Sequence, residues 1–108
     1  MSGTFEVLAE ASRRQILDLL VDGERAVGEV VAQLALSQPA VSKHLKVLRE
    51  AGLVDVRTDA QRRLYRVRPE PLREVDDWLA PYRRQWAGHL DALERHLGHM
   101  VPEGGGEA

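Results

Sequence analysis

The sequence of 108 residues contains no cysteine. The chain therefore forms no disulfide, offers no thiolate to a metal ion and has no thiol with which to sense redox changes. Aromatic residues make up only 5% of the chain, and no apolar run approaches the roughly 20 residues that a membrane span needs. The N-terminus lacks a basic start followed by an apolar block, so we expect no signal peptide. These absences favour a small cytoplasmic protein.

Signatures of catalysis are also missing. Serine, histidine and aspartate occur, but no nucleophile motif and no glycine-rich phosphate loop surrounds them. We therefore expect a protein that is not an enzyme and that needs no cofactor. The length fits one small domain, which we place at residues 1–100, followed by a disordered glycine-rich tail at residues 101–108.

The net charge of −2 hides an uneven distribution of charge along the chain. Residues 37–68 hold eight lysines or arginines and three acidic residues, a local charge of 8 − 3 = +5. Residues 1–36 hold three basic and six acidic residues, and residues 69–108 hold four and eight. A basic middle between acidic ends indicates a polyanionic partner, although a solvated surface with uneven salt bridges would give the same counts.

Apolar spacing predicts three helices in the first half of the chain. The first begins at Thr4 and ends before Gly23, and the second covers about residues 27–34. The third begins after Ser37, a good N-cap, and ends at Gly52, where a left-handed conformation is usual.

The period then changes from 3.6 to 2. The segments "LVDVRT" and "RRLYRVR", joined by "DAQ", predict a β-hairpin with one half-buried face. The last section is a long helical segment in which Pro81 predicts a kink or a restart. Its apolar residues from Trp86 to Met100 recur at steps of four and three, which is typical of helices that pair. The fold class is mainly α with a β-hairpin, and this element order is that of a winged helix–turn–helix.

The third helix and the hairpin tip carry the residue types that bind DNA. Small and amide side chains at the start of the helix suit base edges in the major groove, whereas its cations suit phosphates. Arginines at a hairpin tip suit a narrow minor groove. For His44, contact with a base, contact with a phosphate and an interface role stay open. The candidate DNA-binding residues are Ser37, Gln38, Ala40, Ser42, Lys43, His44, Lys46, Arg49, Arg57, Arg62 and Arg63.

The segment "SQPAVSKHLKVLREAGLV", followed by the basic hairpin ending near Tyr65, resembles the core of the ArsR-type winged-helix transcriptional repressors. The first helix, "LAEASRRQILDLL", is similar to the opening of that family. The resemblance implies a homodimer that binds an imperfect palindrome in a promoter and that an inducer or another signal releases. It also implies a dimer interface on the first and last helices, for which the candidates are Leu8, Leu79, Tyr82, Trp86, Leu90, Leu93 and Leu97.

The sequence departs from the metal sensors of the family. Ala26 and Gly28 stand where the thiol sensors carry a Cys-x-Cys pair. His96 and His99 have the spacing of half of a second family site, but Arg83 and Gln85 cannot supply its other half. We therefore predict no metal site and keep these two histidines only as weak candidates.

Three alternatives stay open at this level. The histidines could still make the protein a metal-responsive repressor. The basic surface could bind a partner protein instead of DNA. Trp78 and Trp86 could line a pocket for a small inducer between two subunits, although aromatic residues at helical spacing more often form a core.

Overall fold

The computed structural model describes the backbone of residues 3–100 and the side chains of residues 3–97, so the expected tail at residues 101–108 lies outside the described residues. The chain divides into two compact units, with the boundary between Val75 and Asp76. The expectation of one domain over residues 1–100 stays a prediction.

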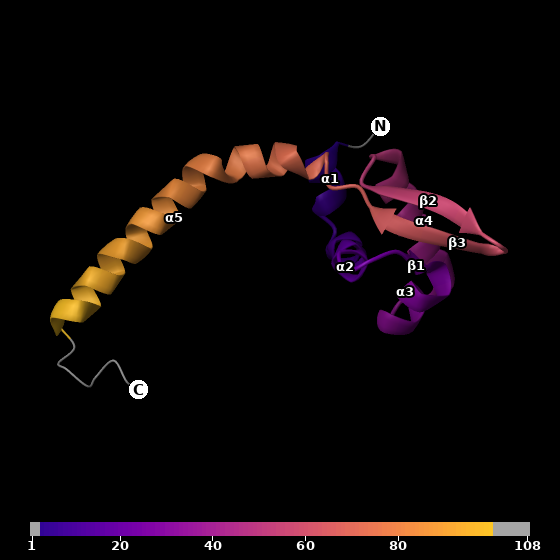
Figure 1. Cartoon of the computed structure of the whole chain (residues 1–108), viewed down its shortest axis with the longest axis horizontal. Coiled ribbons are helices and arrows are strands. Elements are labelled where there is room, and N and C mark those ends of the chain that lie inside the picture. Colours follow the sequence, from indigo (N-terminus) through magenta and orange to yellow (C-terminus); the bar gives the residue numbers. More distant parts are fainter. Residues whose placement is uncertain (1–2, 101–108) are drawn as a thin grey trace. The chain divides into compact units, whose positions relative to one another are not determined.

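The first unit holds four helices and a three-stranded sheet, in the order expected for a winged helix–turn–helix (Figure 1). Its elements are α1 (Thr4–Leu8), α2 (Ala11–Leu20), β1 (Arg25–Ala26), α3 (Val27–Gln33), α4 (Gln38–Glu50), β2 (Val54–Asp59) and β3 (Arg62–Val67).

The predicted first helix is divided into α1 and α2 at Ala9 and Glu10. Val7 and Ile16 are both fully buried, yet nine residues at 100° per residue would place them on opposite sides of one straight helix. The break lets both side chains enter the same core. Arg14 stabilises it by donating hydrogen bonds to the carbonyl oxygens of Leu8 and Ala9 at 2.6 and 3.2 Å.

Both ends of α4 have the caps that the sequence predicted. The Ser37 hydroxyl accepts a hydrogen bond from the Ala40 backbone N–H at 3.2 Å. At the other end Gly52 has a φ of 79°, and the N–H groups of Gly52 and Leu53 donate back to Arg49 and Leu48. These two bonds form a Schellman motif, which satisfies carbonyl groups at the end of the helix and turns the chain into β2.

The sheet has the strand order β1–β3–β2, and all its pairs are antiparallel. Strands β2 and β3 form the predicted hairpin, with Val54 opposite Val67 at its base and Asp59 opposite Arg62 at its tip. We call this hairpin, residues 54–67, the wing. Strand β1 was not predicted, because two residues carry no readable period. It pairs Arg25 with Tyr65 and so joins the wing to the helices.

One hydrophobic core holds the helices of the first unit against the sheet. Each main element contributes at least one side chain that is almost completely buried. The core members are Val7, Ile16, Leu17, Leu20, Val30, Val41, Leu45, Leu48, Leu53, Val54 and Tyr65.

Helix α5 (Leu72–Met100) continues through Pro81 as one helix, so of the two outcomes that the sequence predicted there, a kink or a restart, the restart does not occur. The Arg83 guanidinium lies 2.8 Å from the Asp76 carboxylate, so an ion pair spans the turn that contains the proline. None of the helices in the described part of the chain is both long enough and apolar enough to cross a membrane.

Candidate nucleic-acid interface

Helix α4 is fixed in the core by one face, so its other faces are available at the surface. Val41, Leu45 and Leu48 have no exposed area and hold the helix against α2 and β2. The candidate contact residues project from the remaining surface: Ser37, Gln38, Ser42, Lys43, Lys46 and Arg49 are exposed, and Ala40 and His44 are half-buried.

The three cations of α4 form no ion pair with any described residue, although the chain has more acidic residues (17) than basic ones (15). Lys43, Lys46 and Arg49 are absent from the seven ion pairs that connect described side chains. The pairs engage arginines elsewhere instead. The outward surface of α4 therefore keeps an uncompensated positive charge, which favours an anionic partner.

His44 lies on the side of α4 that faces α2. Its Nδ1 accepts a hydrogen bond from the Arg13 guanidinium at 3.4 Å. Arg13 is itself held by the Val7 carbonyl oxygen at 3.1 Å and by the Glu10 carboxylate at 3.2 Å.

The three candidate arginines of the wing do not lie together, because successive residues of a strand point to opposite faces. In the register of the wing, Arg63 is opposite Thr58, whereas Arg62 is opposite Asp59. Arg62 therefore shares one face with Arg57, and Arg63 lies on the other face with Tyr65.

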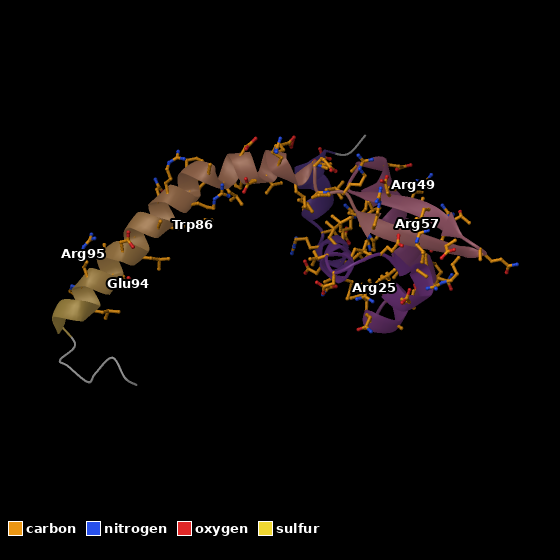
Figure 2. All side chains as sticks on the ribbon, viewed as in Figure 1. Arg25, Arg49, Arg57, Trp86, Glu94 and Arg95 are labelled. Carbon is orange, nitrogen blue, oxygen red and sulfur yellow. The ribbon has the colours of Figure 1, made fainter. Side chains whose placement is uncertain are left out.

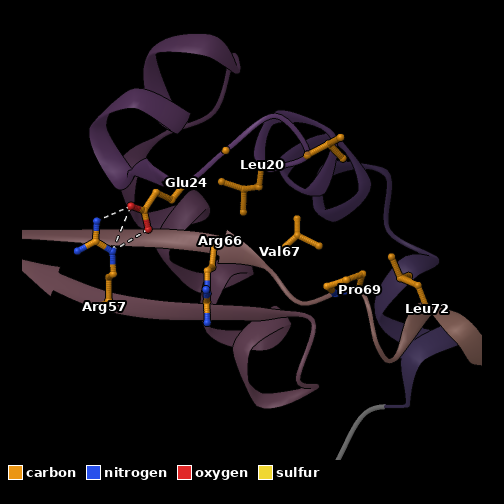
Figure 3. A pocket seen from close by; sticks show the side chains of 9 residues that line it. Leu20, Glu24, Arg57, Arg66, Val67, Pro69 and Leu72 are labelled. Carbon is orange, nitrogen blue, oxygen red and sulfur yellow. Dashed lines mark hydrogen bonds and ion pairs between the residues drawn. The ribbon is translucent and has the colours of Figure 1, made fainter.

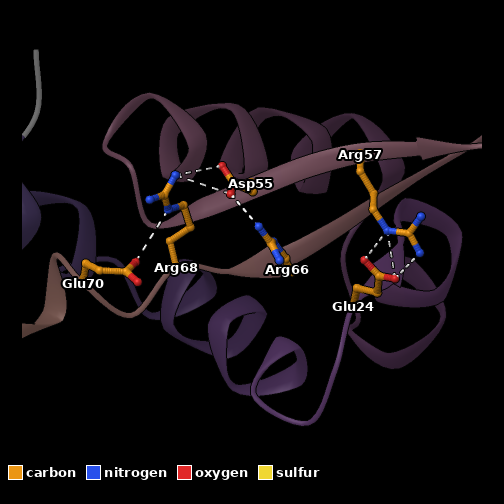
Figure 4. Close-up of polar contacts among 6 residues, drawn as sticks. All are labelled: Glu24, Asp55, Arg57, Arg66, Arg68 and Glu70. Atoms are coloured by element: carbon orange, nitrogen blue, oxygen red, sulfur yellow. Dashed lines mark hydrogen bonds and ion pairs between the residues drawn. The ribbon is translucent and has the colours of Figure 1, made fainter.

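Arg57 and Arg62 are both engaged by carboxylates from the segment around β1. The Arg57 guanidinium forms hydrogen bonds to both carboxylate oxygens of Glu24, with its Nε at 2.9 and 3.1 Å from them (Figure 4). Arg62 Nη2 lies 2.9 Å from Glu29 Oε1. The hydrogen bond from Arg57 is the main cause that lowers the pKa of Glu24, and the same bond raises the pKa of Arg57.

The base of the wing has its own ion pairs. Asp55 lies 3.3 Å from Arg66 and 3.4 Å from Arg68, and Arg68 also lies 3.6 Å from Glu70 (Figure 4). These pairs compensate Arg66 and Arg68 at the base of the wing. The local charge of +5 in residues 37–68 is therefore not spread evenly: it is neutralised at the base of the wing and uncompensated on α4.

A hollow of about 640 Å³ lies beside the Glu24–Arg57 pair, between the end of α2 and the base of the wing (Figure 3). Its apolar part is formed by Leu20, Val21, Val67, Pro69 and Leu72. Its charged groups are already paired within the unit, Arg57 with Glu24 and Arg66 with Asp55. The hollow thus offers apolar surface but no unpaired charge.

In the second unit of the chain, helix α5 carries an apolar stripe. Most large side chains of this stripe are about half exposed. The exposed fraction is 53% for Trp86 and 57% for Leu90. Figure 2 shows Trp86 and Arg95 projecting from different sides of the helix. The exposed members are Trp78, Tyr82, Trp86, Leu90, Leu93 and Leu97, whereas the candidates Leu79 and Leu8 are half-buried. Contiguous apolar surface of this kind marks an interaction site.

The weak metal candidates are only partly described. His96 projects from α5, and the side chain of His99 lies outside the described residues. Among the described side chains, no three histidine, aspartate or glutamate groups come together in a way that would hold a metal ion.

Comparison with known proteins agrees with this architecture. The sequence profile of the family described as bacterial regulatory protein, arsR family, matches residues 11–56, from α2 into β2. The arsenic resistance transcriptional regulator ArsR1 of Pseudomonas putida is 37% identical over 89 residues, which cover 71% of this chain and 70% of that protein. The biofilm growth-associated repressor of Agrobacterium fabrum is 44% identical over 62 residues, which cover 57% and 53% of the two chains.

A solved structure extends the likeness to the fold. The crystal structure of a possible transcriptional regulator for arsenical resistance matches 84% of this chain and 92% of that chain, with 40% identity and a TM-score of 0.63. The element order, the wing and this likeness define a winged helix–turn–helix protein. The chain belongs to the ArsR family of bacterial regulatory proteins.

The family resemblance predicted from residues 37–65 is therefore confirmed, as is the fold class. The three proteins compared above are named as transcriptional regulators or repressors and not as enzymes. The chain spans about half the length of the Agrobacterium repressor and less than two thirds of several other curated relatives.

Proposed function

We propose that this protein is a homodimeric transcriptional repressor that binds double-stranded DNA at an imperfect palindrome in a promoter. The observation that carries the proposal is the outward surface of α4, where Lys43, Lys46 and Arg49 have no ion-pair partner among the described residues. Phosphates supply most of the affinity of such a surface for DNA.

Helix α4 enters the major groove in this proposal. A major groove about 12 Å wide admits a helix, and the small side chains Ala40 and Ser42 let the backbone of α4 approach the bases. Gln38, at the start of the helix, has the amide that pairs with the edge of an adenine. The wing then lies beside the neighbouring minor groove, where its arginines meet a more negative potential.

Dimerisation is supported by the stripe on α5. Leaving half-exposed tryptophan and leucine side chains in water is unfavourable, and a second copy of the same stripe provides the apolar surface that covers them. Tyr82, Trp86, Leu90, Leu93 and Leu97 are the members we assign to this contact, with Leu79 at its start and Leu8 on α1. A symmetric pair presents two copies of α4 to successive major grooves, about one helical turn apart.

The signal that releases the DNA does not use cysteine, since the chain has none. We infer a small organic inducer as the effector and the cytoplasm as the place of action. The metal-responsive alternative and the protein-binding alternative gain no support from the described side chains, whose uncompensated cations fit a polyanion better than a metal ion.

A gel-shift titration with the DNA upstream of the protein's own gene tests the proposal. We expect a specific complex with the wild type, and we expect Gln38→Ala to lose about 1–3 kcal/mol of discrimination at one base position. An equal loss of affinity on all sequences would show that Gln38 does not read a base. Absence of any complex at low salt, on this DNA and on random duplex, would contradict the proposed function.

A further inference from the structure

A notch of about 330 Å³ lies between helix α4 and strand β3. Its lining residues are Val27, Ser42, Lys46, Arg49, Arg63 and Tyr65. Ser42, Lys46 and Arg49 are spaced i, i+4, i+7 and therefore share one face of α4. On the α4 side the notch is therefore lined by one hydroxyl and two cations. On the wing side it is lined by a third cation, Arg63.

Arg63 is held above the ring of Tyr65, with its guanidinium carbon 5.9 Å from the ring centroid. This distance is within the range of a cation–π interaction. Tyr65 is only 8% exposed and lies in the central strand, opposite Arg25 on one side and Val56 on the other. The Arg63 guanidinium therefore lies over a buried ring of the central strand.

The notch holds three cations and no acid. Lys46, Arg49 and Arg63 take part in no ion pair with the described residues, whereas Arg57 and Arg62 on the opposite face of the wing are paired. Three neighbouring positive charges repel each other until an anion lies between them. Guanidinium groups bind phosphate oxygens in a forked geometry, and the Ser42 and Tyr65 side chains add hydroxyl donors.

We propose that this notch seats one phosphate, a backbone phosphodiester of DNA, which α4 and the wing hold together. The inference rests on the proposed function and adds to it a specific shared contact. Because Arg49 and Arg63 bind the same phosphate, helix and wing are fixed to one position of the DNA backbone. Lys43 points about 100° away from Ser42 on α4 and contacts a different phosphate.

A double-mutant cycle tests the shared contact. Binding of the full-length chain to duplex DNA is measured by fluorescence anisotropy for Arg49→Ala, Arg63→Ala and the double variant. Each single variant loses about tenfold or more in affinity, because a charge-assisted hydrogen bond is lost. The double variant binds within about threefold of the weaker single variant, because the phosphate is already released when one arginine is absent.

Lys43→Ala combined with Arg63→Ala is the matched control, since Lys43 does not line the notch. Its two losses multiply, and each substitution reduces the slope of log K against log salt by about 0.9 per subunit. Thermal unfolding confirms that every variant is folded. If the losses of Arg49→Ala and Arg63→Ala also multiply, the two residues contact separate phosphates and the inference is wrong. If the wild type shows no salt-dependent binding, the proposed function itself falls.

A second measurement identifies the source of the phosphate. Inorganic phosphate is titrated into the wild type without DNA while the ring resonances of Tyr65 are followed. We expect no saturable shift at concentrations that leave DNA binding intact. A saturable shift at such concentrations would assign the notch to a free anion and would overturn the assignment to DNA.

Discussion

Replacing Glu29 by glutamine should strengthen the binding of DNA. Glu29 Oε1 accepts two hydrogen bonds, from the Ala26 backbone N–H at 2.8 Å and from Arg62 Nη2 at 2.9 Å. The first bond satisfies the backbone N–H of Ala26, which is the N-cap of α3. Ala26 has no side-chain acceptor for the Glu29 backbone N–H, so only one of the two bonds of a capping box is made. The second bond pairs the Arg62 guanidinium with a carboxylate that would compete with a phosphate for it. Glu29→Gln keeps the acceptor for Ala26 and removes the charge that competes for Arg62.

The magnitude follows from the exposure of the pair. The Arg62 and Glu29 side chains are 59% and 47% exposed, so their ion pair contributes about 0–1 kcal/mol to the free energy of unfolding. When residue 29 is neutral, this free energy is no longer spent on breaking the pair, and affinity for DNA rises by up to about fivefold per subunit. One more cation that reaches a phosphate steepens the slope of log K against log salt by about 0.9 per subunit.

Anisotropy titrations of wild type, Glu29→Gln and Asp55→Asn on one random duplex, at several salt concentrations, measure the effect. Asp55→Asn is the control, because Asp55 pairs with Arg66 and Arg68 at the base of the wing and with neither Arg62 nor a notch residue. Weaker binding by Glu29→Gln, or an unchanged slope, would refute the reasoning. It would mean that Glu29 orients Arg62 toward the DNA and does not withhold it.

Three further predictions concern stability and assembly. The pKa of Glu24 is lower in the folded chain, so its contribution to stability is present above pH 4.5, the ordinary glutamate value, and is lost as the pH falls through the folded pKa. Glu24→Gln should therefore reduce the fall of the urea midpoint of unfolding at acid pH, and an unchanged fall would contradict this. Gly52→Ala should lower the free energy of unfolding by about 1–2 kcal/mol, because a φ of 79° is strained for alanine. The added Cβ would meet only Pro71 Cγ, at an ordinary 3.8 Å, so the loss comes from the backbone and not from a clash. An unchanged stability would show that the turn relaxes. A chain that ends at Leu79 should sediment as a monomer, and a stable dimer would place the interface elsewhere.

Local signals in the sequence were sufficient for α4 and the wing. Ser37 and Gly52 mark the ends of the helix through their caps, and the change of period at Leu53 marks the start of the hairpin. Both signals depend on neighbouring residues only. The division of the first helix at Ala9 could have been predicted from the 180° angle between Val7 and Ile16, which a single core cannot accommodate.

The partners of the arginines could not be predicted from local signals. Arg57 and Arg62 each pair with an acid 33 residues earlier in the chain, because β1 brings that segment beside β3. A two-residue strand has no readable period, so this long-range contact is not visible in the sequence. Strand alternation alone places Arg63 on the other face of the wing, where it lines the notch with α4.

The salt dependence of wild-type binding to random duplex is the most direct test of the account. The surface of α4 and the notch carries four cations without an ion-pair partner among the described residues, Lys43, Lys46, Arg49 and Arg63, so the proposed dimer presents 2 × 4 = 8 of them. If the three notch cations of each subunit share one phosphate and Lys43 contacts another, the dimer neutralises 2 × 2 = 4 phosphates. If every cation contacts its own phosphate, the dimer neutralises eight. We therefore predict a slope of log K against log salt between about −3.6 and −7.2. A slope near zero would contradict the claim that this surface binds the DNA backbone.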